Sequence, residues 1–108
     1  MSHDVTVLDA ACPICKRSGS IWFEFNSTYN LTPMFDAAGF RMRDFNGKTG
    51  AEVAPILAAA VAVMESDPAK FRAFDSPNGW GTYDQIMPYL REFLAAVDAH
   101  PTAMVDVQ

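Results

Sequence analysis

Two segments of the chain carry the same helix-start signal, which constrains the fold more than any other feature of the sequence. Thr49 and Thr82 are each followed three residues later by a carboxylate or amide side chain, Glu52 and Gln85. A threonine before the first helical residue and a Glu or Gln at the third helical position satisfy two free backbone N–H groups reciprocally. The sequence therefore predicts two helices that begin at these threonines.

The two helices differ in the faces that they present. The second, predicted over residues 83–99, has apolar side chains at helical spacing on one face: Ile86, Leu90, Phe93, Leu94 and Val97. The first, predicted to end near residue 65, has an alanine-rich middle that permits close packing against a neighbour. Shorter helices are expected to begin at residues 32–33, with Thr32 as the cap, and at residues 67–68, because a capping residue precedes a proline at both places.

Three runs have the character of β-strands. Residues 5–8 and 20–25 are rich in β-branched and aromatic side chains, and residues 102–108 alternate between apolar and polar positions. The first two runs would form a hairpin with residues 12–19 at its tip, and residues 40–44 are expected to be extended. The sequence thus predicts one α+β domain over residues 1–108. A small antiparallel sheet, made of the N-terminal hairpin and the C-terminal strand, would be covered on one face by three to four helices.

Composition restricts the classes of partner. Half of the 108 residues are hydrophobic, which is enough for one core, and the net charge is -5. An acidic chain is poorly suited to a nucleic-acid backbone or an anionic membrane, so we expect neither as a partner. The sequence begins without a secretory signal, and its longest apolar run, residues 53–64, is too short to cross a bilayer. A cytoplasmic location is therefore expected.

The only two cysteines, Cys12 and Cys15, form a Cys-Pro-Ile-Cys turn. This spacing occurs in thiol-redox sites and in zinc knuckles. Redox chemistry would require the cysteine turn to open a helix, but Gly19 and a predicted strand follow it instead. Zinc binding would require further ligands from His3, His100 or a second subunit. Zinc is the one cofactor that the sequence suggests, and two inert reduced thiols are the alternative.

Two polar segments are the stronger candidates for a binding site. The first, NSTYN at residues 26–30, contributes Asn26, Thr28 and Asn30, whose side chains either cap a helix or read the uncharged polar edges of a ligand. The second is the NGWGTY loop at residues 78–83. Its candidate residues are Asn78, Trp80 and Tyr83, and the two rings either offer a stacking surface or fill the edge of the core. If the two segments line one cleft, they form the predicted ligand site.

The sequence contains few residues in arrangements typical of catalytic sites. The only histidines lie near the chain ends, and no nucleophile elbow, phosphate loop or zinc-protease motif is present. Nothing in the sequence nominates an enzyme, and we expect binding without catalysis.

The same two segments carry a family resemblance. Residues 26–34 (NSTYNLTPM), 37–39 (AAG), 78–83 (NGWGTY) and 99–101 (AHP) resemble small proteins of bacteriophages and actinobacteria. Those proteins share an Asn-x-Thr-x-Asn stretch with a following Met and a Gly-Trp-Gly-x-Tyr loop, and they have no assigned activity. The resemblance covers roughly residues 25–107 and does not extend to the Cys12–Cys15 turn. It implies a phage setting, in which small acidic proteins bind and block a host component.

These observations lead to one functional hypothesis and two alternatives. The chain is expected to be a cytosolic, phage-related binding module that captures a small polar ligand or a host protein, with an anti-defence role. One alternative is a zinc or thiol-redox protein centred on Cys12 and Cys15. The other is a structural subunit that forms homo-oligomers through its helix faces.

Overall fold

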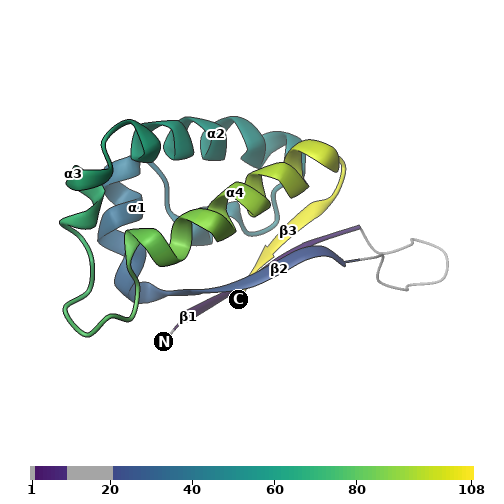
Figure 1. Ribbon diagram of the computed structural model, residues 1–108. Coiled ribbons are helices and arrows are strands. Elements are labelled where there is room, and N and C mark those ends of the chain that lie inside the picture. The colour runs from purple at the N-terminus through teal and green to yellow at the C-terminus, as the bar shows by residue number, and fades with distance from the viewer. Residues whose placement is uncertain (1, 10–20) are drawn as a thin grey trace, which may run out of the picture.

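A three-stranded antiparallel sheet forms one layer of the molecule, and helices form the other. The computed structural model describes residues 2–9 and 21–108. The strands are β1 (Ser2–Leu8), β2 (Ile21–Thr28) and β3 (Met104–Val107), in the order β2-β1-β3. All the helices lie on one face of this sheet (Figure 1). The predicted α+β fold is confirmed, with the N-terminal hairpin strands and the C-terminal strand in one sheet.

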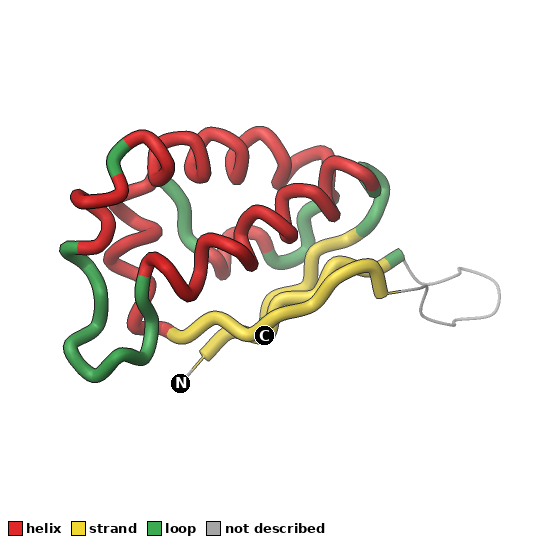
Figure 2. Tube along the Cα trace, viewed as in Figure 1, coloured by secondary structure: helices red, strands yellow, loops and turns green. Residues whose placement is uncertain are grey.

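In the described part of the chain, the helical layer contains four α-helices and two short 3-10 helices (Figure 2). They are η1 (Tyr29–Leu31), α1 (Thr32–Ala38), η2 (Met42–Phe45), α2 (Gly50–Ser66), α3 (Pro68–Arg72) and α4 (Tyr83–Ala99). Within the described residues, no helix is both long enough and apolar enough to cross a membrane.

The strands bury alternate side chains under the helices. In β1, Val5 and Val7 are buried, and Val5 pairs with Phe25 of β2 and Val107 of β3. Successive side chains of a strand point to opposite faces of the sheet, so this register gathers the apolar positions of all three strands on one face.

Both predicted capping boxes are present. The Thr49 and Thr82 hydroxyls each accept a hydrogen bond from a backbone N–H three residues later, at 3.3 Å. Oε1 of Glu52 and of Gln85 accept in return from the backbone N–H groups of the two threonines, at 3.1 and 3.3 Å. Helices α2 and α4 therefore begin where the sequence predicted.

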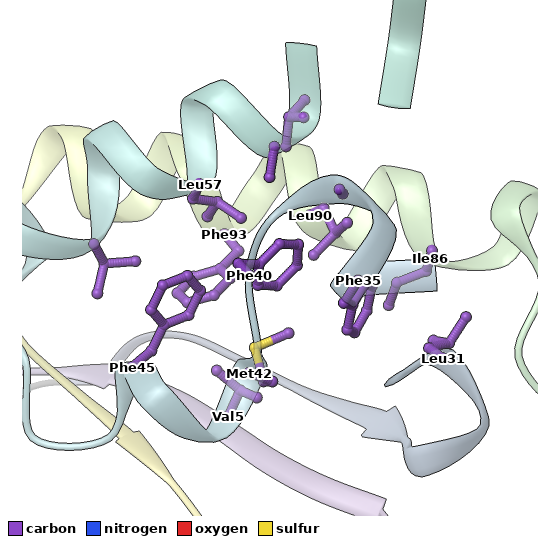
Figure 3. Packing of buried hydrophobic residues seen from close by; sticks show 14 of the residues in the cluster. Val5, Leu31, Phe35, Phe40, Met42, Phe45, Leu57, Ile86, Leu90 and Phe93 are labelled. Atoms are coloured by element: carbon purple, nitrogen blue, oxygen red, sulfur yellow. The ribbon is translucent and has the colours of Figure 1, made fainter. Parts of the chain in front are cut away.

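The core lies between α2, α4 and the sheet (Figure 3). The predicted face of α4 is buried except at Leu94, which is half-buried. Four phenylalanines continue this core in series: Phe35 lies 4.7 Å from Phe40, Phe40 lies 5.5 Å from Phe45, and Phe45 lies 6.0 Å from Phe93, between ring centroids. These contacts attach the segment between α1 and α2 to the core.

The structure corrects two local predictions. Residues 40–44, expected to be extended, include the first part of η2. Met42 and Phe45 are three residues apart and both buried, and a 3-10 turn of three residues per turn brings such a pair to one side. Thr32 is the first residue of α1 rather than its cap, and the side chain of Thr28 caps η1 instead.

The two edges of the sheet differ in their partners. The outer edge of β3 is paired with residues 46–48: the Gly47 N–H donates to the Val105 carbonyl at 2.9 Å, and the Val105 N–H donates to the Lys48 carbonyl at 2.8 Å. The Val107 N–H donates to Asn46 Oδ1 at 2.9 Å. Within the described ranges, the backbone hydrogen bonds of β2 go only to β1, so the second edge of β2 is open.

The sheet register also identifies the backbone groups at this open edge. Asp4 and Gln108 exchange both of their backbone hydrogen bonds. The even-numbered residues of β1 therefore direct their backbone N–H and C=O groups to β3, and the odd-numbered residues direct theirs to β2. Phe25, which pairs with Val5, is therefore hydrogen-bonded to β1. Its neighbours Glu24 and Asn26 consequently direct their N–H and C=O groups to the open edge.

Candidate functional site

An open cleft of about 450 Å³ lies beside the end of β2, under the first turns of α4 and the loop that precedes it. The residues that line it are Asn26, Thr28, Leu31, Gly79, Trp80, Gly81, Gln85, Ile86 and Tyr89. The structure thus brings together residues of both polar segments that the sequence singled out. Asn26, Thr28 and Trp80 line the cleft directly.

Trp80 presents its indole to solvent on a fixed backbone. Its side chain is 73% exposed, so it does not fill the edge of the core. The Trp80 N–H donates to Asn78 Oδ1 at 2.9 Å, and the Trp80 carbonyl accepts from Asn30 Nδ2 at 2.9 Å. Asn78 Oδ1 also accepts from the Ser76 hydroxyl at 2.6 Å. Asn30 and Asn78 therefore position the tryptophan and leave its ring free.

Gly81 lets this loop approach β2 closely. Its backbone has φ +103°, and a Cβ added there would lie 2.8 Å from Cγ2 of Thr28 and 3.2 Å from Cγ of Leu31. A side chain at this position would push the loop away from the wall of the cleft. The second glycine beside Trp80, Gly79 at φ +78°, has open space around its Cβ position.

The side-chain amides of Asn26 and Asn30 donate most of their hydrogens to other groups of the protein. Asn26 Nδ2 donates to Ser2 Oγ at 2.9 Å and to Asp4 Oδ1 at 2.8 Å, which uses both of its hydrogens. Asn30 Nδ2 spends one hydrogen on the Trp80 carbonyl. These amides thus stabilise the walls of the cleft and have few donors left for a ligand.

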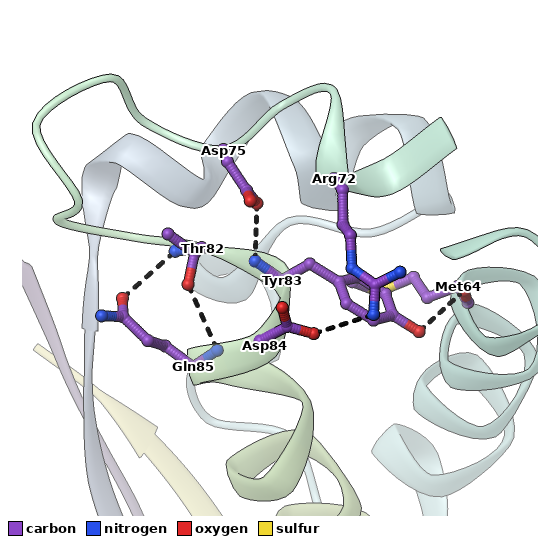
Figure 4. Close-up of polar contacts among 7 residues, drawn as sticks. All are labelled: Met64, Arg72, Asp75, Thr82, Tyr83, Asp84 and Gln85. Carbon is purple, nitrogen blue, oxygen red and sulfur yellow. Dashed lines mark hydrogen bonds and ion pairs between the residues drawn. The ribbon is translucent and has the colours of Figure 1, made fainter. Parts of the chain in front are cut away.

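Tyr83 lies apart from the cleft, although the sequence grouped it with Trp80. It is only 5% exposed, and its hydroxyl donates to the Met64 carbonyl at 3.1 Å. Its backbone N–H donates to Asp75 Oδ1 at 2.7 Å, and the Arg72 guanidinium lies 5.1 Å from its ring centre. Figure 4 shows these contacts beside the Thr82–Gln85 cap. Tyr83 fastens the end of the loop to α2 and presents no free stacking face.

Tyr89 takes the position that the sequence assigned to Tyr83. Its ring is 49% exposed at the cleft and stacks on Phe25 with 5.9 Å between centroids and 9° between planes. Gln85, Ile86 and Tyr89 stand at helical spacings of three and four residues, so they share one side of α4. This spacing was the signal in the sequence that could have identified Tyr89.

The predicted zinc or redox site lies outside the described residues, because Cys12 and Cys15 fall in the segment 10–20. In residues 2–9 and 21–108, no group of three His, Cys, Asp or Glu side chains could hold a metal ion. His100 stacks on Trp22 with 3.9 Å between ring centroids, and Trp22 Nε1 donates to Asp9 Oδ1 at 3.0 Å.

The two histidines are too far apart to complete one zinc site together. His3 pairs with Ser27, five residues along β2 from Trp22, on which His100 stacks. Five residues span roughly 17 Å of strand, whereas zinc binds imidazole nitrogen at about 2 Å. Of the two, His100 lies at the end of the sheet where β2 begins, because it stacks on Trp22. The zinc hypothesis itself stays a prediction.

The chain matches no model of a known protein family, no curated protein sequence and no solved structure. The resemblance to phage and actinobacterial proteins therefore stays a prediction.

Proposed function

We propose that the protein is a non-catalytic binding module that captures an extended segment of a partner protein. The segment pairs with the open edge of β2 and inserts one side chain into the Trp80 cleft. The phage setting, the host cytosol and a host protein as the partner belong to this proposal through the family resemblance alone.

The open edge of β2 is the observation that carries the proposal. An edge strand with free N–H and C=O groups is a template for a further strand, and natural proteins usually cover or charge such an edge. Here the opposite edge of the sheet is paired, whereas among residues 2–9 and 21–108 only β1 forms backbone hydrogen bonds with β2. Peptide-binding domains that work by strand addition use such an edge for affinity and an adjacent pocket for specificity.

The cleft supplies the adjacent pocket. Asn26 directs its backbone N–H and C=O groups to the open edge, and the same residue is one of those that line the cleft. A strand paired at Asn26 would therefore run beside Trp80 and Tyr89, the two exposed rings of the cleft. Aromatic side chains of this kind often dominate the energy of protein interfaces.

The same geometry favours a protein segment over the small polar ligand that the sequence also suggested. Recognition of a small polar molecule needs several free and convergent donors or acceptors. The Asn26 amide hydrogens are used by Ser2 and Asp4, and the lining of the cleft is mainly apolar, with two exposed aromatic rings. A backbone edge beside an aromatic pocket matches an extended peptide better.

Selection from a random peptide library against the purified protein tests the proposal. We expect peptides whose affinity falls by about tenfold or more in Trp80→Ala, because central interface aromatics contribute about 2 kcal/mol or more. Trp22→Ala is the matched control, since Trp22 is also exposed on β2 but stacks on His100 far from the cleft. It should change affinity by less than about twofold.

A second pair of variants tests the strand edge. Glu24→Pro removes one outward N–H, and an edge strand tolerates proline where its N–H faces solvent. We expect Glu24→Pro to abolish peptide binding and Glu24→Ala to preserve it, with both proteins folded by urea titration. Selected peptides that bind Glu24→Pro and Trp80→Ala as well as the unmodified protein would refute the proposal.

A structural, self-associating subunit is the second candidate, and the same open edge favours it. In that case β2 would pair with β2 of another copy of this chain. Sedimentation velocity over a range of protein concentrations distinguishes the two functions. The binding module stays monomeric, whereas the structural subunit shifts to dimers that Glu24→Pro dissolves.

A further inference from the structure

A second pocket, of about 220 Å³, shares Thr28 with the Trp80 cleft and is otherwise separate from it. It lies between the start of β1, the η1 and α1 segment and residues 41–43. Its lining residues are His3, Thr28, Tyr29, Thr32, Phe35, Arg41, Met42 and Arg43. In this group, the sequence suggested a role in ligand or metal binding only for Thr28 and His3.

The rim of this pocket is positively charged in an otherwise acidic protein. Arg41 pairs with Asp36 at 2.9 Å, so its charge is compensated. Arg43 forms no ion pair with any residue that the structure describes. One guanidinium charge at the pocket is therefore uncompensated within the described chain, although the whole protein has a net charge of -5.

His3 responds to this charge. Burial and, second, the nearby Arg43 guanidinium lower the pKa of His3 below its ordinary value, so the imidazole is neutral near pH 7. Tyr29 lies against it with 4.4 Å between ring centroids. The charged or titratable groups around this imidazole are thus Arg43, Arg41 with its partner Asp36, and Tyr29.

The remaining lining divides into an apolar floor and hydroxyl groups. Phe35 and Met42 are buried members of the core, and Figure 3 shows both on the side of the core away from Leu57. The Thr28 hydroxyl accepts from the Asn30 N–H at 3.3 Å, which leaves its own hydrogen free to donate, and Thr32 adds a second hydroxyl.

A buried hydroxyl without a partner lies beside this group. Ser27 is 1% exposed, and its Oγ has no hydrogen-bond partner among the residues described. Ser27 pairs directly with His3 across the sheet, and paired side chains lie about 5 Å apart on the same face. A buried hydroxyl without a partner destabilises the fold, so Ser27 places an unsatisfied polar group next to His3.

We infer that this pocket binds a small organic anion in which one carboxylate or phosphate group is attached to a single apolar ring. The anionic group lies at the Arg43 guanidinium and the threonine hydroxyls, and the ring lies over Phe35 and Met42. The size agrees, because a cavity of about 150 Å³ holds benzene and this pocket has about 220 Å³. Guanidinium groups recognise carboxylate and phosphate by paired hydrogen bonds.

NMR of the two histidine rings tests the inference, with phenyl phosphate and benzoate as probes. His3 is in the pocket, and His100, stacked on Trp22, is the internal control. We expect saturable shifts of the His3 resonances and none of His100. A bound anion also opposes the Arg43 charge, so the pKa of His3 should rise on binding. The affinity for benzoate, whose carboxylate stays ionised where His3 titrates, should therefore increase as the pH falls.

Matched variants and probes complete the experiment. Arg43→Gln should weaken binding by about tenfold or more, and Arg91→Gln, which removes an equal charge on α4, by less than about twofold. Benzyl alcohol should not bind, and inorganic phosphate alone should bind less tightly than phenyl phosphate. Trp80→Ala should leave the affinity unchanged, because this site does not depend on the proposed peptide cleft.

Each contrary result overturns the inference. Binding of benzyl alcohol with the affinity of phenyl phosphate would show an apolar cavity without anion recognition. Equal losses in Arg43→Gln and Arg91→Gln would show a non-specific response to net charge. Unchanged His3 resonances at saturating probe would show that the pocket is not a ligand site.

Discussion

At the scale of single residues, the geometry of the cleft depends on two glycines with different surroundings. Gly79 and Gly81 both adopt positive φ, but only Gly81 packs against Thr28 and Leu31. Adding a side chain at either position therefore costs free energy because the backbone is left-handed. Only at Gly81 does it also cause a steric clash.

This difference predicts unequal effects of alanine at the two positions. Gly79→Ala should lower the free energy of unfolding by about 1–2 kcal/mol, the cost of a left-handed backbone. Gly81→Ala should cost roughly 1–3 kcal/mol more, because its Cβ would overlap the Thr28 side chain. Urea denaturation of both variants measures the difference. Equal losses would show that the loop does not pack against β2 as closely as described.

The sequence indicated which segments could form a site more readily than it indicated which hydrogen bonds their side chains would make. The polar segments were recognised because Asn, Thr, Gly and Trp are typical of turns and sites. Which amides are free depends on contacts between distant segments, such as Asn26 with Asp4. Tyr83 illustrates the same limit, since its hydroxyl bonds to Met64 on another helix.

At the scale of elements, the local signals were reliable where side chain and backbone interact within one turn. The capping boxes fixed the starts of α2 and α4, and the apolar spacing of α4 identified its buried face. The η2 turn was missed because its two buried side chains, Met42 and Phe45, are held by the tertiary core rather than by a local signal.

The two capping boxes give a prediction with a built-in control. Thr49→Ala and Thr82→Ala should each lower the free energy of unfolding by about 1 kcal/mol, the usual value of an N-cap side chain. Thr102→Ala, at an exposed position without a side-chain hydrogen bond to a described residue, should change it by less than about 0.5 kcal/mol. Thermal or urea unfolding of the three variants provides the comparison.

The boxes should also differ in their response to acid. Hydrogen bonds from the Thr49 backbone and side chain lower the pKa of Glu52 from its ordinary value of 4.5. A lowered carboxyl pKa means that the contribution is present above the unfolded pKa and is lost as the pH falls through the folded one. The Thr49→Ala effect should therefore shrink in acid, while that of Thr82→Ala, whose partner is the amide Gln85, should not. Parallel behaviour of the two variants in acid would contradict this account.

At the scale of the whole molecule, the sequence indicated the layers but not the edges. The strands, the helices and the covered face all follow from apolar periodicity. The order β2-β1-β3 depends on which strand returns beside β1. That order places β2 at one edge of the sheet, and residues 46–48 pair with the other edge. In the part of the chain that the structure describes, the edge of β2 has no such partner. The proposed site is a product of this topology, which no single segment of the sequence encodes.

Amide hydrogen exchange of the labelled protein, free and bound to a selected peptide, tests the central claim most directly. The N–H groups of Glu24 and Asn26 should exchange fast in the free protein and become protected in the complex. The N–H groups of Val105 and Val107, bonded to Lys48 and Asn46, should be protected in both states. Protection of Glu24 and Asn26 in the free protein, or their continued fast exchange with peptide bound, would contradict strand addition at β2.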